Sequence, residues 1–133
     1  DVTLHTGVAM ATQDLTATAG EDVRLSGGAQ LLAQDGDLSA TADTGDLLMS
    51  QNSVVGAAGD VALTAGQAMT LTTAMVAAGA SLDLTAGQGS MVITQSNVGA
   101  GEDLTATAGQ HLLISHSSYL TASPAPLLSL LHR

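Results

Sequence analysis

The hexapeptide "LTATAG" stands at residues 15–20 and recurs letter for letter at residues 104–109. Weaker copies lie between them: "LSATAD" at 38–43, "VALTAG" at 61–66 and "LDLTAG" at 82–87. The residues that precede the five copies are Asp14, Asp37, Asp60, Ser81 and Asp103, so successive copies start at nearly even intervals. A period of about 22 residues is typical of solenoid proteins, in which each repeat forms one turn.

Within each copy, apolar and hydroxyl residues alternate with a period of two, which predicts a β-strand. The first apolar position is aliphatic in every copy (Leu15, Leu38, Val61, Leu82 and Leu104). The opposite parity contains a threonine in every copy: Thr18, Thr41, Thr64, Thr85 and Thr107. We expect this Thr ladder to face outward, and the Gly or Asp two residues later to begin a turn.

Two further strands are predicted in each repeat. The second is marked by apolar pairs such as Val23 with Leu25 and Met91 with Ile93. The third is marked by six apolar residues at a constant spacing, which we expect to stack as one internal column: Met10, Leu32, Val54, Val76, Val98 and Leu120.

Three short strands in each coil predict an all-β chain that folds as a right-handed parallel β-helix, or solenoid, of five to six coils. A leucine-rich repeat is disfavoured because no helical segment recurs. We expect residues 1–122 to form the β-helix and residues 123–133 to form a non-repeat tail or cap, in which Leu127, Leu128, Leu130 and Leu131 make one or two helical turns. The sequence enters the repeat at a second strand without a polar cap, so we expect a section of a longer array.

Composition limits the possible functions. The 133 residues include no Cys, Trp or Phe, and twelve Asp and Glu are opposed by only two Arg, Arg24 and Arg133, which gives a net charge of −10. We expect no nucleic-acid partner, because binding to phosphates needs clustered Lys and Arg. No apolar run approaches the ~20 residues of a membrane span, so we expect no membrane insertion. Without Cys, thiol chemistry and Cys-based zinc sites are excluded, and no cofactor is expected.

The repeat offers three candidate kinds of site: a calcium site, an ice-binding face and an enzyme active site. Stacked carboxylates at Asp14, Asp37, Asp60 and Asp103 are a weak calcium candidate, but Asp is also a common turn former and the Gly-Gly-x-Gly-x-Asp repeat is absent, so we expect turns. Outward T-x-T triplets resemble those of flat ice-binding β-helices, which makes ice binding an alternative. A β-helical polysaccharide-active enzyme is the least favoured alternative, because Arg24 is the only Arg in the repeats, so we expect no enzyme and no catalytic residues.

The stretch "DLTATAGEDVRLSGGAQLLAQDG" at residues 14–36, together with "QHLLIS" at 110–115, resembles the haemagglutinin repeats of large secreted exoproteins of Gram-negative bacteria. These are the filamentous haemagglutinin and contact-dependent inhibition proteins of two-partner secretion. The resemblance covers roughly residues 1–122. It implies a β-helical shaft that leaves the cell through an outer-membrane secretion pore and is secreted or held at the cell surface.

In such proteins the shaft serves adhesion or presents a distal receptor-binding or toxin region. The sequence shows no secretion domain with an Asn-Pro signature, no "VENN" boundary and no toxin domain. The resemblance therefore implies a rigid spacer for this chain, with cell-surface receptors contacted by regions outside it.

Overall fold

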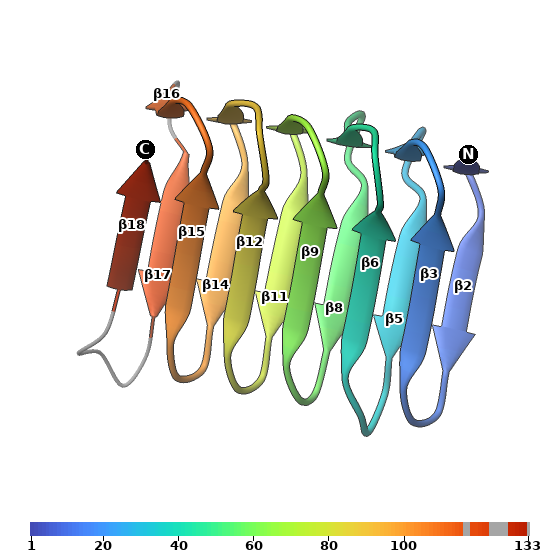
Figure 1. Cartoon of the computed structure of the whole chain (residues 1–133). Coiled ribbons are helices and arrows are strands. Elements are labelled where there is room, and N and C mark those ends of the chain that lie inside the picture. The colour runs from blue at the N-terminus through green and yellow to red at the C-terminus, as the bar shows by residue number, and fades with distance from the viewer. Residues whose placement is uncertain (116–117, 123–127, 133) are drawn as a thin grey trace.

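The chain winds around a single axis as a right-handed parallel β-solenoid of three sheets (Figure 1). The structure is a computed structural model that describes residues 1–115, 118–122 and 128–132, the last range for the backbone only. The described residues contain strands, turns and no helix. Each turn adds one strand to each sheet, and the paired strands of the described residues are all parallel, for example β3 with β6 and β12 with β15.

The three sheets are named here in the order in which the chain meets them. Sheet A contains β1 (Val2–His5), β4 (Val23–Ser26), β7 (Leu47–Met49), β10 (Met69–Thr72), β13 (Met91–Thr94) and β16 (Leu112–Ser115). Sheet B contains β2 (Val8–Ala11), β5 (Gln30–Ala33), β8 (Val54–Ala57), β11 (Met75–Ala78), β14 (Asn97–Ala100) and β17 (Tyr119–Ala122). Sheet C contains β3 (Leu15–Ala19), β6 (Leu38–Ala42), β9 (Val61–Ala65), β12 (Leu82–Ala86), β15 (Leu104–Ala108) and β18 (Leu128–His132).

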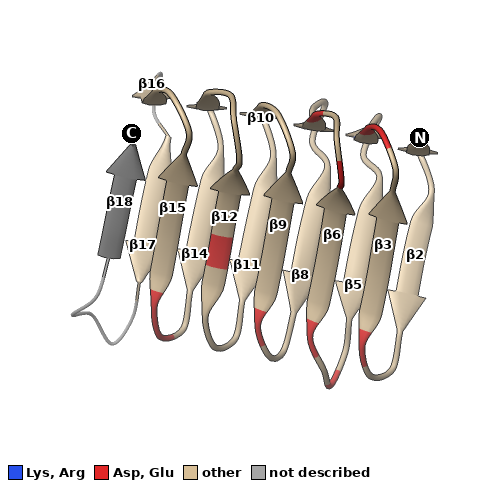
Figure 2. Ribbon diagram, viewed as in Figure 1, with Lys and Arg blue, Asp and Glu red and all other residues tan. Residues whose placement is uncertain are grey.

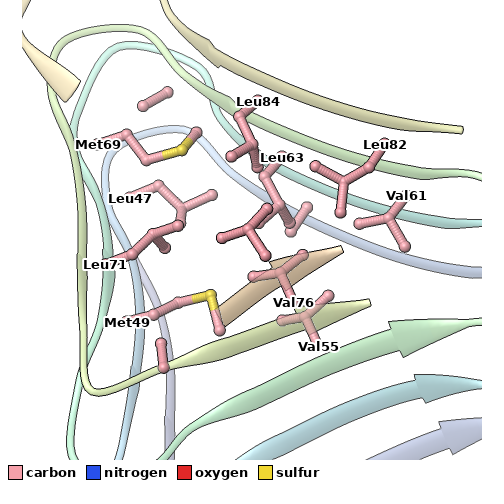
Figure 3. Close-up of a cluster of buried hydrophobic side chains, with 14 of the residues drawn as sticks. Leu47, Met49, Val55, Val61, Leu63, Met69, Leu71, Val76, Leu82 and Leu84 are labelled. Carbon is pink, nitrogen blue, oxygen red and sulfur yellow. The ribbon is translucent and has the colours of Figure 1, made fainter. Parts of the chain in front are cut away.

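The core is a narrow column of aliphatic side chains contributed by all three sheets (Figure 3). Leu47 and Met69 from sheet A, Leu63 and Leu84 from sheet C and Val55 from sheet B are at most 1% exposed. Like residues stack on like along the axis, since Leu63 pairs with Leu84 and Met69 with Met91. Small side chains suffice because three sheets converge on one axis, which explains how the chain packs a core with no Phe or Trp.

The internal column predicted from constant spacing is wrong at three of its six members. Met10, Leu32 and Val54 point outward, and Met10 is 56% exposed. The inward residues are one position away, and the column of sheet B is Ala9, Leu31, Val55, Val76, Val98 and Leu120. The error arises because the coil from Gln30 to its partner Val54 is longer than the coil from Val54 to its partner Met75.

The corners between sheets absorb these differences in length. The AB corner joins sheets A and B, and it is three residues long after β4 (Gly27 to Ala29) but two after β10 (Thr73 and Ala74). Every described residue with a left-handed backbone (φ from 47° to 80°) lies in this corner: Thr6, Gly27, Gly28, Gln51, Asn52, Thr73 and Gln95. The left-handed conformation turns the chain sharply, so strands stay in register while the corners vary.

The C-terminal residues also differ from expectation. Residues 128–132 form strand β18 in sheet C and not the helical turns that the leucines suggested, while residues 123–127 and 133 lie outside the described part. The backbone of β18 pairs with β15, so that Leu128 lies beside Leu104 and Leu130 beside Ala106. An exposed sheet edge offers unpaired N–H and C=O groups, and pairing satisfies them where a helix laid across the end would not.

Candidate functional site

The outer face of sheet C is a regular array of hydroxyl groups. The Thr ladder lies in register along five successive strands, as Thr18, Thr41, Thr64, Thr85 and Thr107 pair in order. The second outward column is less regular, with Thr16, Ser39, Ala62, Asp83 and Thr105. Asp83 is exposed and accepts a hydrogen bond of 3.3 Å from the hydroxyl of Thr85. The face therefore carries one unbroken Thr column and one interrupted column.

Acidic residues lie at both edges of sheet C, along most of the corner with sheet B but only in the first coils of the corner with sheet A (Figure 2). Six of the twelve lie in the BC corner, between sheets B and C: Asp14, Asp35, Asp37, Asp60, Glu102 and Asp103. Five lie at the start of sheet A, in the CA corner between sheets C and A: Asp1, Glu21, Asp22, Asp43 and Asp46. The remaining acid is Asp83 on β12. The AB corner contains none among the described residues, so the negative charge is concentrated around one face.

The stacked aspartates of the BC corner bond to the backbone of the next coil. A carboxylate oxygen of Asp14 accepts from the N–H of Asp37 (3.0 Å), that of Asp37 from Asp60 (2.8 Å) and that of Asp60 from Ser81 (2.9 Å). The backbone carbonyl of the corner aspartate also accepts a hydrogen bond from the preceding coil, as Asp37 O does from the N–H of Leu15 at 2.9 Å. The side chain thus supplies an acceptor for a corner N–H of the next coil.

A second aspartate ladder follows the CA corner. Asp22 accepts from the N–H of Asp46, and Asp46 from the N–H of Ala68, both at 3.0 Å. Arg24, the only Lys or Arg in the described part of the chain, forms ion pairs with Asp22 and Asp1 beside this ladder. The two ladders give Asp a structural reason to recur at the same place in each coil.

The calcium candidate is not formed by this arrangement. Asp14, Asp37 and Asp60 occupy successive coils and each directs an oxygen to a backbone N–H, while Ser81 separates Asp60 from Asp103. Across residues 1–115, 118–122 and 128–132, no group of three or more His, Asp or Glu side chains is arranged to hold a metal ion. Calcium needs six to eight oxygen ligands around one point, and stacking spreads these carboxylates along the axis.

One hollow brings three carboxylates together. Asp60, Asp83 and Asp103 line a shallow depression of about 380 Å³ beside Ser81 and Thr105. A polysaccharide-active enzyme needs a pair of carboxylates that flank the scissile bond. No basic or aromatic side chain lines this depression to bind a sugar.

The outer face of sheet B is uncharged and apolar. Four large hydrophobic side chains on it are about half or more exposed: Val8 (58%), Met10 (56%), Met75 (47%) and Tyr119 (64%). Two hollows share Met75 and Asn97: one of about 230 Å³ towards the AB corner and one of about 260 Å³ over Gly99. The sequence pattern does not predict this surface, because constant spacing places Met10, Leu32 and Val54 inside. The adjacent apolar residues Leu31 and Val55 are the signal that the opposite set of positions could face the core.

Comparison with known proteins adds no relative. No protein-family model matches the sequence, no curated protein matches it, and no solved structure matches it. Within the described residues there is also no helix long and apolar enough to cross a bilayer. Inferences about function therefore start from the fold and its surfaces.

Proposed function

We propose that this chain is a structural shaft segment of a secreted haemagglutinin-like adhesin or contact-dependent inhibition exoprotein. In this role it is a rigid spacer that presents a distal binding or toxin region, after export of the parent protein through an outer-membrane pore. The observation that carries the proposal is the uninterrupted stacking of three parallel sheets around one aliphatic core. The repeated "TAG" pattern supplies the link to exoproteins.

The mechanical argument follows from the hydrogen bonding. Each coil is joined to the next through all three sheets and through side-chain bonds at the corners, such as Asp37 to Asp60 and Ser96 to Ala74. Bending or stretching the rod along its axis would lengthen backbone hydrogen bonds on at least one side. A solenoid of this kind gains about 4.8 Å of length per coil, so its reach scales with the number of repeats.

To test this proposal, the chain is displayed on a bacterial surface between a membrane anchor and a receptor-binding tip, and the distance of the tip from the membrane is measured. Duplicating residues 61–103 adds two whole coils, since Leu104 is the equivalent of Val61 two coils later, and we expect the tip to move outward by about 10 Å with unchanged affinity. The matched control inserts a Gly/Ser linker of the same length, which behaves as a flexible coil and gives no fixed displacement. Equal results for the two insertions would contradict a rigid spacer, as would receptor binding by the chain without its tip.

Ice binding is a second candidate, favoured by the register of the Thr ladder over five coils. Ala62 and Asp83 interrupt the neighbouring column, so a matched two-column array covers only part of the face. We expect no thermal hysteresis from the purified chain. A hysteresis gap that disappears in Thr64→Val would replace the spacer proposal with this candidate.

A further inference from the structure

Two copies of this chain can approach through the outer face of sheet B without setting carboxylates on that face against one another. Within the described residues, the outer face of sheet B and the AB corner contain none of the twelve acidic residues, although the chain has a net charge of −10. Like charges a few ångströms apart disfavour association, so the negative edges of sheet C oppose contact there. The strands of sheet A also contain no acidic residue and carry Arg24, so charge leaves both faces available and the exposed apolar side chains distinguish sheet B.

The same face carries most of the exposed apolar surface. Of the five large hydrophobic side chains that are well exposed in the described residues, Val8, Met10, Met75 and Tyr119 lie on sheet B and only Leu113 lies on sheet A. Contiguous exposed apolar groups on an otherwise charged protein mark interaction surfaces. Met side chains adapt to a partner surface because they are flexible and polarisable.

The shape of the face is a ridge beside a trough. Each of the last four strands presents two outward residues, two positions apart and therefore about 7 Å apart. The first column is larger and the second smaller in every coil from β8 onward: Val54 with Gly56, Met75 with Ala77, Asn97 with Gly99 and Tyr119 with Thr121. The hollow over Gly99, between Met75 and Tyr119, lies in this trough.

This arrangement is self-complementary for one kind of two-fold symmetry. A two-fold axis parallel to the solenoid axis exchanges the two columns, so the ridge of one copy meets the trough of the other in the same coil. Met75 then faces Ala77 of the second copy, and Asn97 faces Gly99. An axis perpendicular to the solenoid would instead set ridge against ridge. In a two-fold interface each contact occurs twice, so the fit is doubled.

We propose that a second copy of this chain docks on the outer face of sheet B, with the two solenoids side by side and parallel. The four strands that carry the ridge and trough, at about 4.8 Å each, and four residues of about 3.3 Å give a complementary contact of about 19 by 13 Å, or ~250 Å² for each copy. This is about a third of the ~800 Å² that each partner buries in a stable complex. The dimer is therefore weak and reversible.

Analytical ultracentrifugation up to about 1 mM protein tests the dimer, with Met75→Glu and Leu113→Glu as a matched pair. Both side chains are about half exposed and point outward, Met75 from sheet B and Leu113 from sheet A. We expect Met75→Glu to weaken association by at least tenfold and Leu113→Glu to leave it within twofold. A chain that is monomeric at about 1 mM overturns the proposal, as does equal weakening by the two variants.

Shape is tested with Ala77→Leu, which adds apolar surface to the trough and introduces no charge. Ridge-into-trough docking predicts several-fold weaker association because the space for Met75 is filled. Stronger association would show general hydrophobic contact and overturn the proposed geometry. Circular dichroism of the monomer verifies that each variant retains its β-structure.

Orientation is tested with single cysteines, since the chain has no Cys of its own. Under oxidising conditions a mixture of Met75→Cys and Ala77→Cys is expected to cross-link into the mixed dimer. A mixture of Met75→Cys and Val54→Cys places both cysteines on the ridge, so cross-linking between them would indicate the antiparallel arrangement. Preferential linking of the second mixture would overturn the parallel dimer.

Discussion

Sheets B and C share one core but present opposite surfaces to solvent. Five strands of sheet C, from β3 to β15, have five residues each and show a Thr ladder between two acidic edges, whereas the strands of sheet B have four residues and show Val, Met, Tyr and small residues without charge. Inward, both sheets contribute only Ala, Val, Leu and similar side chains. The difference shows that stacking restricts the inward positions to aliphatic side chains, whereas the outward positions of different sheets can carry different residue types.

The acidic edges and the uncharged face are explained by different needs. At the BC and CA corners Asp side chains accept hydrogen bonds from the next coil, as Asp37 does from the N–H of Asp60 and Asp22 from the N–H of Asp46. At the AB corner, left-handed residues such as Thr73 and Gln95 make the turn, and the serines Ser53 and Ser96 bond to backbone carbonyls nearby. Because the AB corner needs no carboxylate, sheet B has an uncharged border on that side.

The largest expected effect comes from the shared core. Leu84 is fully buried on β12 between Leu63 and Ala106, and Leu84→Ala should lower the free energy of unfolding by about 2–5 kcal/mol through lost burial and a cavity. Urea denaturation measures the change. The control Asp83→Ala alters the exposed neighbour on the same strand and should stay within about 0.5 kcal/mol. Equal losses would mean that the interior is not the common support of the two sheets.

A smaller effect is expected at the acidic edge of sheet C. Asp37→Ala removes the acceptor for the N–H of Asp60, and we expect a loss of about 1 kcal/mol in the free energy of unfolding. Asp37→Asn retains a side-chain oxygen and should recover most of that loss. If Ala and Asn behave alike in thermal denaturation, the aspartate ladder has no structural role and the difference between the corners needs another cause.

The smallest expected effect concerns the Thr ladder itself. Thr64→Ala should cost about 0.5 kcal/mol, since it removes β-branched contacts with Thr41 and Thr85 in the neighbouring coils. Thr64→Val keeps the branched shape and should be close to wild type in chemical denaturation. A Val variant that loses as much as Ala would show that the hydroxyl groups, and not the side-chain shape, hold this face together.

The sequence predicts where the strands lie more accurately than which residues of neighbouring strands pair with one another. The Thr ladder and the aliphatic columns of sheets A and C follow from the alternation, because a strand with one buried face fixes its own parity. In sheet B the runs "QLLA" and "VVGA" place apolar residues at both parities, so the sequence alone does not say whether Leu31 or Leu32 is buried. The assumption of one constant spacing favoured the wrong choice for Leu32 and Val54.

The apolar outer face of sheet B depends on that register. A column with Met10 and Val54 inside removes two of its apolar side chains from solvent, and Met75 and Tyr119 alone do not define a surface. The aspartates were recognised as turn residues, but their bonds to the next coil depend on which corner residues lie one above another. That information appears only when the coils are stacked.

The sequence by itself determined the period, the strand type, the small aliphatic core and the outward Thr ladder, since each follows from local alternation repeated at nearly regular intervals. Tertiary structure decided the register of sheet B, the strand at residues 128–132 and the separation of charge from the apolar face. The physical reason is that corner lengths differ from coil to coil and only pairing with the neighbouring coil fixes how each difference is absorbed.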